Sequence, residues 1–195
     1  MKKLALLLLM LMLNTNVFCS LSFNEGLSQT NNLVIDTLKA SGDISVSGNV
    51  YKENMTYGEM GVSYNSTAIT IVTANVYYKV TPNVLAGESL VNCTFADSKL
   101  TLLKDGVYMA VLSMSFSGAA NSDIHGGISV DTTEPIGTAE FSRKLGATGD
   151  VGCVATTGIR RLTSGQTVEV QVENTSNTND ITIEHMELIV IRIAP

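Results

Sequence analysis

Residues 104–118, KDGVYMAVLSMSFSG, carry the strongest hydrophobic pattern of the chain. Apolar side chains fill alternate positions from Tyr108 to Phe116, and the positions between them are also apolar from Val107 to Val111. A strand with one face in water has apolar residues at alternate positions and polar residues between them. We therefore predict a central β-strand that is covered on both sides. One cover is a second sheet, and the other is a third layer or a neighbouring copy of the chain.

The segments around this strand are short, rich in β-branched residues and separated by turn residues, and no helical period of useful length appears. These features predict an all-β fold, a ten-stranded antiparallel jelly-roll sandwich. In residues 168–173 valines alternate with Glu, Gln and Glu, which predicts one face in water. The glycines between 146 and 152 predict several short strands up to Leu162. In 181–193 the apolar set changes phase, which predicts a β-bulge near His185 or Glu187.

The N-terminal part of the chain differs in composition from the rest. Residues 1–19 join two lysines, an apolar run and a polar end, the pattern of a secretory signal peptide. Residues 20–56 form an entry segment in which 40–44 and 46–50 match at an offset of six. This repeat predicts either a simple hairpin or the end of a trimeric β-stalk. The head then covers residues 57–195, and no membrane insertion is expected after signal cleavage.

Charge and cysteines narrow the possible roles. The chain has 12 Lys and Arg against 18 Asp and Glu, and it lacks a basic run, so nucleic-acid binding is not expected. Signal cleavage would leave Cys93 and Cys153. A disulfide between them would close a loop of about 60 residues and add about 4 kcal/mol. Their apolar strand-like surroundings favour two buried free thiols instead, and both alternatives stay open.

No motif in the sequence indicates catalysis, a metal or a cofactor. His125 precedes two glycines, and His185 stands between Glu184 and Glu187 without a second His or Cys at ligand spacing. The glycine-rich residues 146–152 lack the Lys-Ser/Thr of a phosphate-binding loop. We therefore expect a protein that is not an enzyme, with no catalytic, cofactor-binding or metal-binding residues.

Several motifs in fixed order resemble a known family. The chain resembles the tumour-necrosis-factor-like jelly roll in its complement globular-head form, and is most similar to the version in bacteriophage and environmental-virus fibre or structural proteins. The motifs are Gly106-Val107-Tyr108, Arg143-Lys144-Leu145-Gly146, Gly149-Asp150-Val151-Gly152, Leu162-Thr163-Ser164-Gly165-Gln166-Thr167-Val168 and ITIEHMELIVIRI. Gln166 departs from the pattern, because family members often carry Asp there, and a turn-capping carboxylate is lost.

The resemblance implies a homotrimer that binds partners rather than catalysing a reaction. The predicted function is a secreted or virion-surface head that mediates recognition or adhesion to a cell-surface protein or glycan. A monomeric secreted carbohydrate-binding module is the alternative. The second cover of the central strand is then a neighbouring subunit. The candidates for this trimer interface share one face of the strand: Tyr108, Ala110, Leu112, Met114 and Phe116.

Overall fold

The computed structural model describes residues 55–87 and 90–195, which belong to one compact unit, Tyr51–Pro195. The predicted signal peptide and stalk, 1–19 and 20–56, lie outside the described residues except for 55 and 56. The strands are β1 (Tyr57–Val62), β2 (Ala68–Ile69), β3 (Tyr78–Lys79), β4 (Leu85–Ala86), β5 (Cys93–Ala96), β6 (Lys99–Leu102), β7 (Gly106–Gly118), β8 (Asp123–Val130), β9 (Glu140–Lys144), β10 (Val151–Leu162), β11 (Thr167–Asn174) and β12 (Ile181–Ala194).

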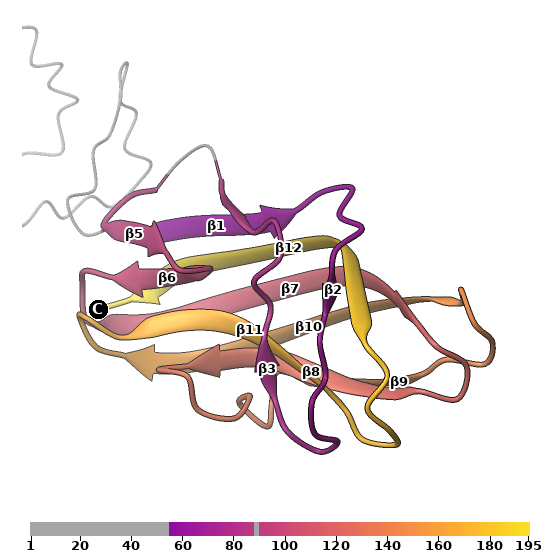
Figure 1. Ribbon diagram of the computed structural model, residues 1–195. Helices are drawn as coiled ribbons and strands as arrows, with labels where there is room; N and C mark the ends of the chain where they lie inside the picture. The colour runs from indigo at the N-terminus through magenta and orange to yellow at the C-terminus, as the bar shows by residue number, and fades with distance from the viewer. Residues whose placement is uncertain (1–54, 88–89) are drawn as a thin grey trace, which may run out of the picture. The chain divides into compact units, whose positions relative to one another are not determined.

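These strands form two antiparallel sheets that pack as a sandwich (Figure 1). One sheet has the order β10-β7-β12-β1-β4, with β2 beside β12, and we call it the β7 sheet. The other has the order β5-β6-β11-β8-β9, with β3 beside β11, and we call it the β11 sheet. The predicted all-β jelly-roll sandwich is confirmed; the described residues form twelve strands rather than the predicted ten, and three of the twelve have only two residues. Within the described residues no helix is long and apolar enough to cross a membrane.

The central strand is β7, which pairs with β10 on one side and β12 on the other. Alternate side chains of this strand, Tyr108, Ala110, Leu112, Met114 and Phe116, point between the two sheets. Tyr108 is 1% exposed and Phe116 is not exposed at all. The Tyr108 hydroxyl donates a hydrogen bond of 2.6 Å to the Lys104 carbonyl, so its one polar group is satisfied inside the core.

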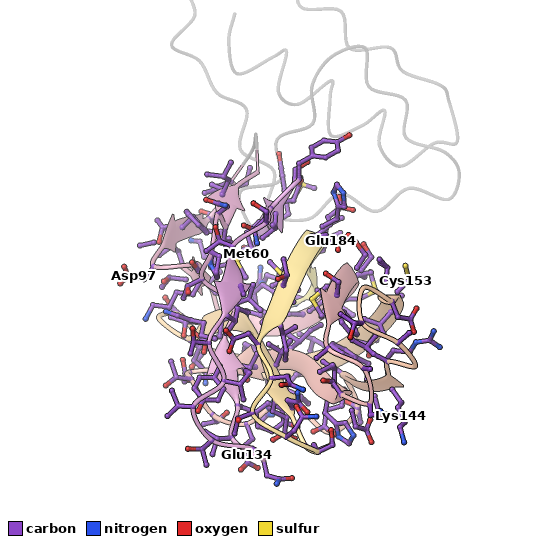
Figure 2. The ribbon with its side chains drawn as sticks, turned by 45° about the vertical axis from the view of Figure 1, so that its right-hand side comes forward. Met60, Asp97, Glu134, Lys144, Cys153 and Glu184 are labelled. Atoms are coloured by element: carbon purple, nitrogen blue, oxygen red, sulfur yellow. The ribbon has the colours of Figure 1, made fainter. Side chains whose placement is uncertain are left out.

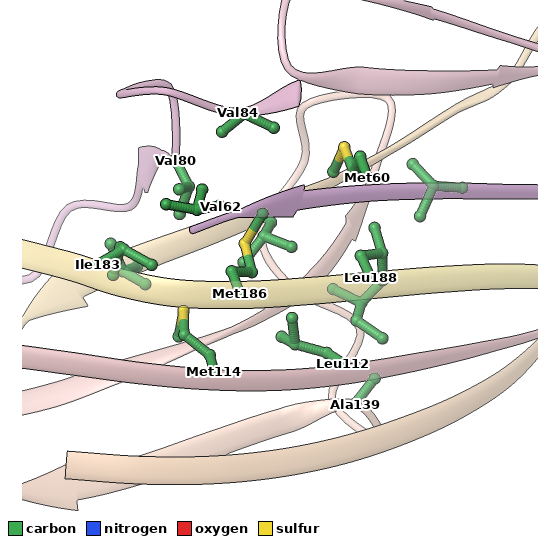
Figure 3. Packing of buried hydrophobic residues seen from close by; sticks show 14 of the residues in the cluster. Met60, Val62, Val80, Val84, Leu112, Met114, Ala139, Ile183, Met186 and Leu188 are labelled. Carbon is green, nitrogen blue, oxygen red and sulfur yellow. The ribbon is translucent and has the colours of Figure 1, made fainter. Parts of the chain in front are cut away.

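This burial corrects the predicted trimer interface. Tyr108, Leu112, Met114 and Phe116 are already covered by the β11 sheet of the same chain, and Ala110 lines the same space beside Tyr108. None of these side chains is free to contact a second subunit. Figure 3 shows Leu112 and Met114 packed in the core with Met186 and Leu188 of β12. The opposite face of the strand, which begins with Val107, Met109 and Val111, is half-buried.

Strand β10 corrects a second prediction, because it is one strand of 12 residues rather than several short ones. Its glycines serve close packing and do not break the strand. A Cβ at Gly152 would lie 2.9 Å from the Phe116 ring, and one at Gly158 would lie 2.8 Å from the Ala139 Cβ. Both glycines therefore let neighbouring side chains approach the backbone.

Strand β12 confirms the predicted bulge. Its pairing with β7 shifts register between Ile183 and His185. The shift keeps Ile183 on the buried side before the bulge and Met186 on the buried side after it. The extra residue explains the phase change in the sequence, because one inserted residue moves the inward set from odd to even positions.

The turn between β10 and β11 keeps its cap although Gln166 replaces the expected Asp. The Gln166 Oε1 accepts a 2.9 Å hydrogen bond from the Thr163 backbone N–H. Its Nε2 donates to Asp131 Oδ2 at 2.7 Å. The amide thus accepts as a carboxylate would and also ties the turn to Asp131, whose pKa is lowered chiefly by the hydrogen bond from the Thr167 N–H.

Both described cysteines are free, and they lie in different sheets. Cys93 in β5 is buried, as expected for a free thiol. Cys153 in β10 is exposed, so the expectation of a second buried thiol is wrong. No disulfide joins the two in the structure, where one thiol is buried and the other is exposed.

We expect the protein to lose stability at alkaline pH through Cys93. Burial raises the pKa of its thiol to about 11 from 9.0. The folded state therefore holds a proton that the unfolded chain has lost, and this stabilisation is complete below pH 9.0 and disappears as the pH rises to about 11. Urea unfolding across this window should show a steep decrease in the free energy of unfolding. Cys93→Ala should flatten the decrease, and an unchanged slope would contradict the assignment.

Candidate functional site

The outward side of the β7 sheet carries two rows of apolar side chains that cross neighbouring strands. The register places Tyr57, Ile191, Met109 and Ile159 in the first row, on β1, β12, β7 and β10. The second row pairs Ile189 with Val111. We call these six residues the apolar outer face. Ile159 is 60% exposed and the other five are half-buried, and none of the described strands forms a second layer over them.

The same side of the sheet becomes polar toward the bulge. Cys153 and His185 both stand opposite Ser115 in the register, one on each side of it. Together with Glu187 they line an open hollow of about 430 Å³. The Tyr64 ring meets the His185 ring edge-on, with centroids 4.8 Å apart. Figure 2 shows Cys153 at the margin of the molecule.

The edge where the two sheets meet is basic. Strands β9 and β10 contact each other there, and a Cβ at Gly152 of β10 would lie 3.1 Å from the Arg143 Cγ of β9. Four exposed cations lie on these strands: Arg143, Lys144, Arg160 and Arg161. Glu59 and Glu187 lie on the outward side of the β7 sheet, where they border the apolar outer face. The edge is thus mainly basic, with Glu140 as an exposed acid on β9, and the outward side holds these two glutamates together with Arg161, which lies opposite Val107.

The outward side of the β11 sheet holds a deeper cleft of about 650 Å³, which we call the Tyr77 cleft. Its wall combines residues of β11 and β9 with the segments 75–77 and 132–134. The lining residues are Asn75, Val76, Tyr77, Thr132, Glu134, Glu140, Gln171 and Glu173. Gly127 of β8 stands between Gln171 and Glu140 in the register, and its missing side chain lets the Ala139 carbonyl and Pro135 approach the strand closely.

The cleft overturns the prediction that this side of β11 faces water. Glu169, Gln171 and Glu173 are all buried, with Glu173 7% exposed. The Gln171 Nε2 donates to Glu169 Oε1 at 2.8 Å, whereas Glu169 Oε2 has no hydrogen-bond partner among the described residues. The segments 75–77 and 132–134 line the cleft, and the Ser129 hydroxyl of β8 donates to the Thr133 carbonyl, so these segments extend over this face.

Tyr77 has an unusual electrostatic environment. Burial raises its pKa to about 12, and the nearby negative charges of Glu173, Glu140 and Glu134 act in the same direction. The raised pKa keeps the tyrosine hydroxyl protonated at neutral pH beside Glu173, which is almost fully buried. Neither this tyrosine nor these glutamates carried a recognisable motif in the sequence.

The histidines take part in no larger constellation. The His125 Nε2 lies 3.6 Å from Asp123 Oδ1, and His185 contacts Tyr64. Among the described residues, no group of three or more His, Cys, Asp or Glu side chains has the arrangement of a metal site. The glycine-rich segment is a turn in which the Gly146 N–H donates to Asp150 Oδ2 at 3.0 Å, as the sequence predicted.

Comparison with known proteins supports the fold. No protein-family model matches the chain, and no curated protein matches its sequence. The globular domain of zebrafish complement 1qA protein matches with a TM-score of 0.52 and 12% identity, over 72% of this chain and 98% of that domain. Eiger TNF from S. frugiperda matches with a TM-score of 0.48 and 10% identity, over 71% of this chain and 94% of that chain. Murine APRIL at pH 5.0 matches with a TM-score of 0.48 and 9% identity, over 72% of this chain and 100% of that chain. The chain therefore has the jelly-roll fold of the complement globular domain.

Proposed function

We propose that the protein is a non-enzymatic recognition head that works as a homotrimer at a virion or cell surface or in the extracellular space. The observation that carries this proposal is the apolar outer face, over which residues 55–87 and 90–195 place no second layer. Apolar surface removed from water contributes about 25 cal/mol per Å², so covering a few hundred Å² in each subunit stabilises an assembly by several kcal/mol. The resemblance to trimeric jelly-roll heads supports an assembly of three chains.

The distribution of charge supports a particular contact in this assembly. In a closed ring of three, one surface of each copy meets a different surface of the next. The basic edge of β9 and β10 complements Glu59 and Glu187, which border the apolar outer face. We therefore place the edge of one copy against the outer face of its neighbour. Like charges would meet if two outer faces packed on each other with these glutamates opposed.

The thiol of Cys153 provides a test within the unmodified protein. Cys153 is exposed in one copy and lies beside the apolar outer face, so an assembled protein should protect it. We expect maleimide labelling to be at least about tenfold slower in the assembled protein than in a Val111→Glu variant that cannot assemble. Cys93 is buried and serves as the internal reference. Equal labelling rates of Cys153 in both proteins would contradict coverage of this side of the sheet.

A further inference from the structure

We propose that the Tyr64 ring and the hollow beside it bind a neutral pyranose ring of a glycan. This inference rests on the proposed recognition function and names the class of its ligand. Tyr64 is 90% exposed, the highest exposure of any large apolar or aromatic side chain in the described residues. It follows β1, at the far end of this strand from Met55, where the described part of the chain begins.

The backbone holds the Tyr64 ring in a fixed position. Tyr64 has a φ of 52°, in the left-handed region that a bulky residue rarely adopts. Asn65 is 5% exposed and fastens this turn, because its N–H and its Nδ2 donate to the Glu184 and Ile183 carbonyls at 3.2 and 2.8 Å. Its Oδ1 accepts a 2.7 Å hydrogen bond from the Asn83 Nδ2. A ring fixed before binding loses little conformational entropy when a ligand stacks on it.

The surroundings of Tyr64 are polar, which favours a sugar over an apolar protein surface. Ser63, Asn65 and Ser66 stand beside it in the chain, and His185 meets its ring edge-on. The centre of a protein–protein contact usually groups several apolar and aromatic side chains. A pyranose instead offers C–H groups, which the negative face of an aromatic ring attracts, and hydroxyls for the polar groups around the ring.

The hollow next to His185 supplies partners for the hydroxyls. Its volume of about 430 Å³ lies within the range of small-molecule sites. Four polar side chains line it: Ser113, Ser115, His185 and Glu187. None of the four makes a hydrogen bond or an ion pair with another described residue, so their donors and acceptors are available to a ligand. Val62 and Met186 add apolar surface for the C–H side of a sugar.

The site is compatible with the proposed trimer. The hollow lies at the bulge end of β12, whereas Ile189 and Ile191 of the apolar outer face lie toward the other end of this strand. A neighbour that covers Cys153 closes the β10 side of the hollow and leaves the Tyr64 side open. Three sites in one assembly then raise the avidity for a surface that carries many copies of a glycan. Glu187 in the lining disfavours an anionic sugar.

The test titrates methyl glycosides into isotopically labelled unmodified protein and follows the backbone amide shifts. The probes are the methyl glycosides of galactose, glucose, mannose and N-acetylglucosamine, the anionic methyl glucuronide, and sorbitol, a polyol without a ring. We expect saturable shifts at Tyr64, Ser115 and His185 with at least one neutral glycoside, and at least about tenfold weaker binding of the glucuronide. Equal binding of sorbitol, or no saturable shift with any neutral glycoside, would overturn the proposal.

Variants show whether the Tyr64 ring carries the binding. Tyr64→Ala should weaken the best glycoside at least about tenfold, and Tyr64→Phe, which keeps the ring face, should bind within about twofold of the unmodified protein. Both variants should fold, because the side chain is 90% exposed. The matched control is Tyr77→Ala on the other sheet, which should bind normally. An equal loss with Tyr77→Ala, or normal binding by a folded Tyr64→Ala variant, would contradict this site.

The Val111→Glu variant separates the sugar site from the trimer. The site belongs to one chain, so the same shifts should appear in this variant, and their loss would contradict the proposal. Saturable shifts in an unmodified protein that sediments as one chain would support the sugar site and contradict the trimer. A trimer without shifts would do the reverse.

Discussion

Replacing Ile191 by Glu should convert the assembled protein into a folded monomer. Ile191 lies on β12 in the first row of the apolar outer face, between Met109 of β7 and Tyr57 of β1. In a single copy its side chain is half-buried and can direct a carboxylate into water. In an assembly the new charge would be buried without a partner, which costs about 3 kcal/mol or more and weakens association by a factor of about 100 or more at each interface.

The control for this variant is Val72→Glu. Val72 is 73% exposed and lies in the segment between β2 and β3, away from the outer side of the β7 sheet. It should assemble like the unmodified protein, because it introduces the same charge at a different surface. Circular dichroism should show that both variants fold. A folded Ile191→Glu variant that sediments as the unmodified protein does would place the interface elsewhere.

Replacing Phe116 by Ala should destabilise the fold itself by about 3–5 kcal/mol. The ring is fully buried in the core, stacks on Phe141 with centroids 5.9 Å apart, and fills the space that Gly152 leaves on β10. Its removal creates a cavity between the sheets that the neighbouring side chains cannot close. The midpoint of denaturant unfolding should shift accordingly.

Phe116→Leu is the matched control, because it retains much of the buried volume and should cost less than half as much. These variants also distinguish core from interface. If Phe116 were at a subunit contact, Phe116→Ala would lower association and leave the monomer's free energy of unfolding unchanged. We expect instead that Phe116→Ala lowers the free energy of unfolding and leaves the folded fraction assembled. A lower assembly mass at an unchanged free energy of unfolding would contradict the corrected position of this strand.

The sequence predicted the sheet structure well where side-chain alternation reports on backbone geometry. The doubly apolar strand became β7, and the phase change in the last strand became the bulge at His185, because each follows from the period of two in a β-strand. Alternation cannot say which of two apolar sides faces the partner sheet. Tyr108 and Val111 look equally suited to either side, and only the packing of the β11 sheet decides between them.

The Tyr77 cleft was hidden for a different reason. Glu169 and Glu173 alternate with valines as on a strand with one side in water, and that pattern is unchanged whether or not another segment lies above it. The cover comes from residues 75–77, before β3, and from the residues after β8, which are distant in sequence from β11. Gly127 could have been a sign, because a glycine inside a strand often marks a close approach or an open site.

Measuring the number of chains in the assembly is the most direct test of the proposed trimer. Light scattering coupled to size-exclusion chromatography measures the mass of the unmodified protein over a dilution series from about 100 to 1 μM, a range in which specific interfaces of ordinary affinity remain formed. The account predicts a mass three times that of one chain, unchanged across the series. A mass of one chain at every concentration would contradict it.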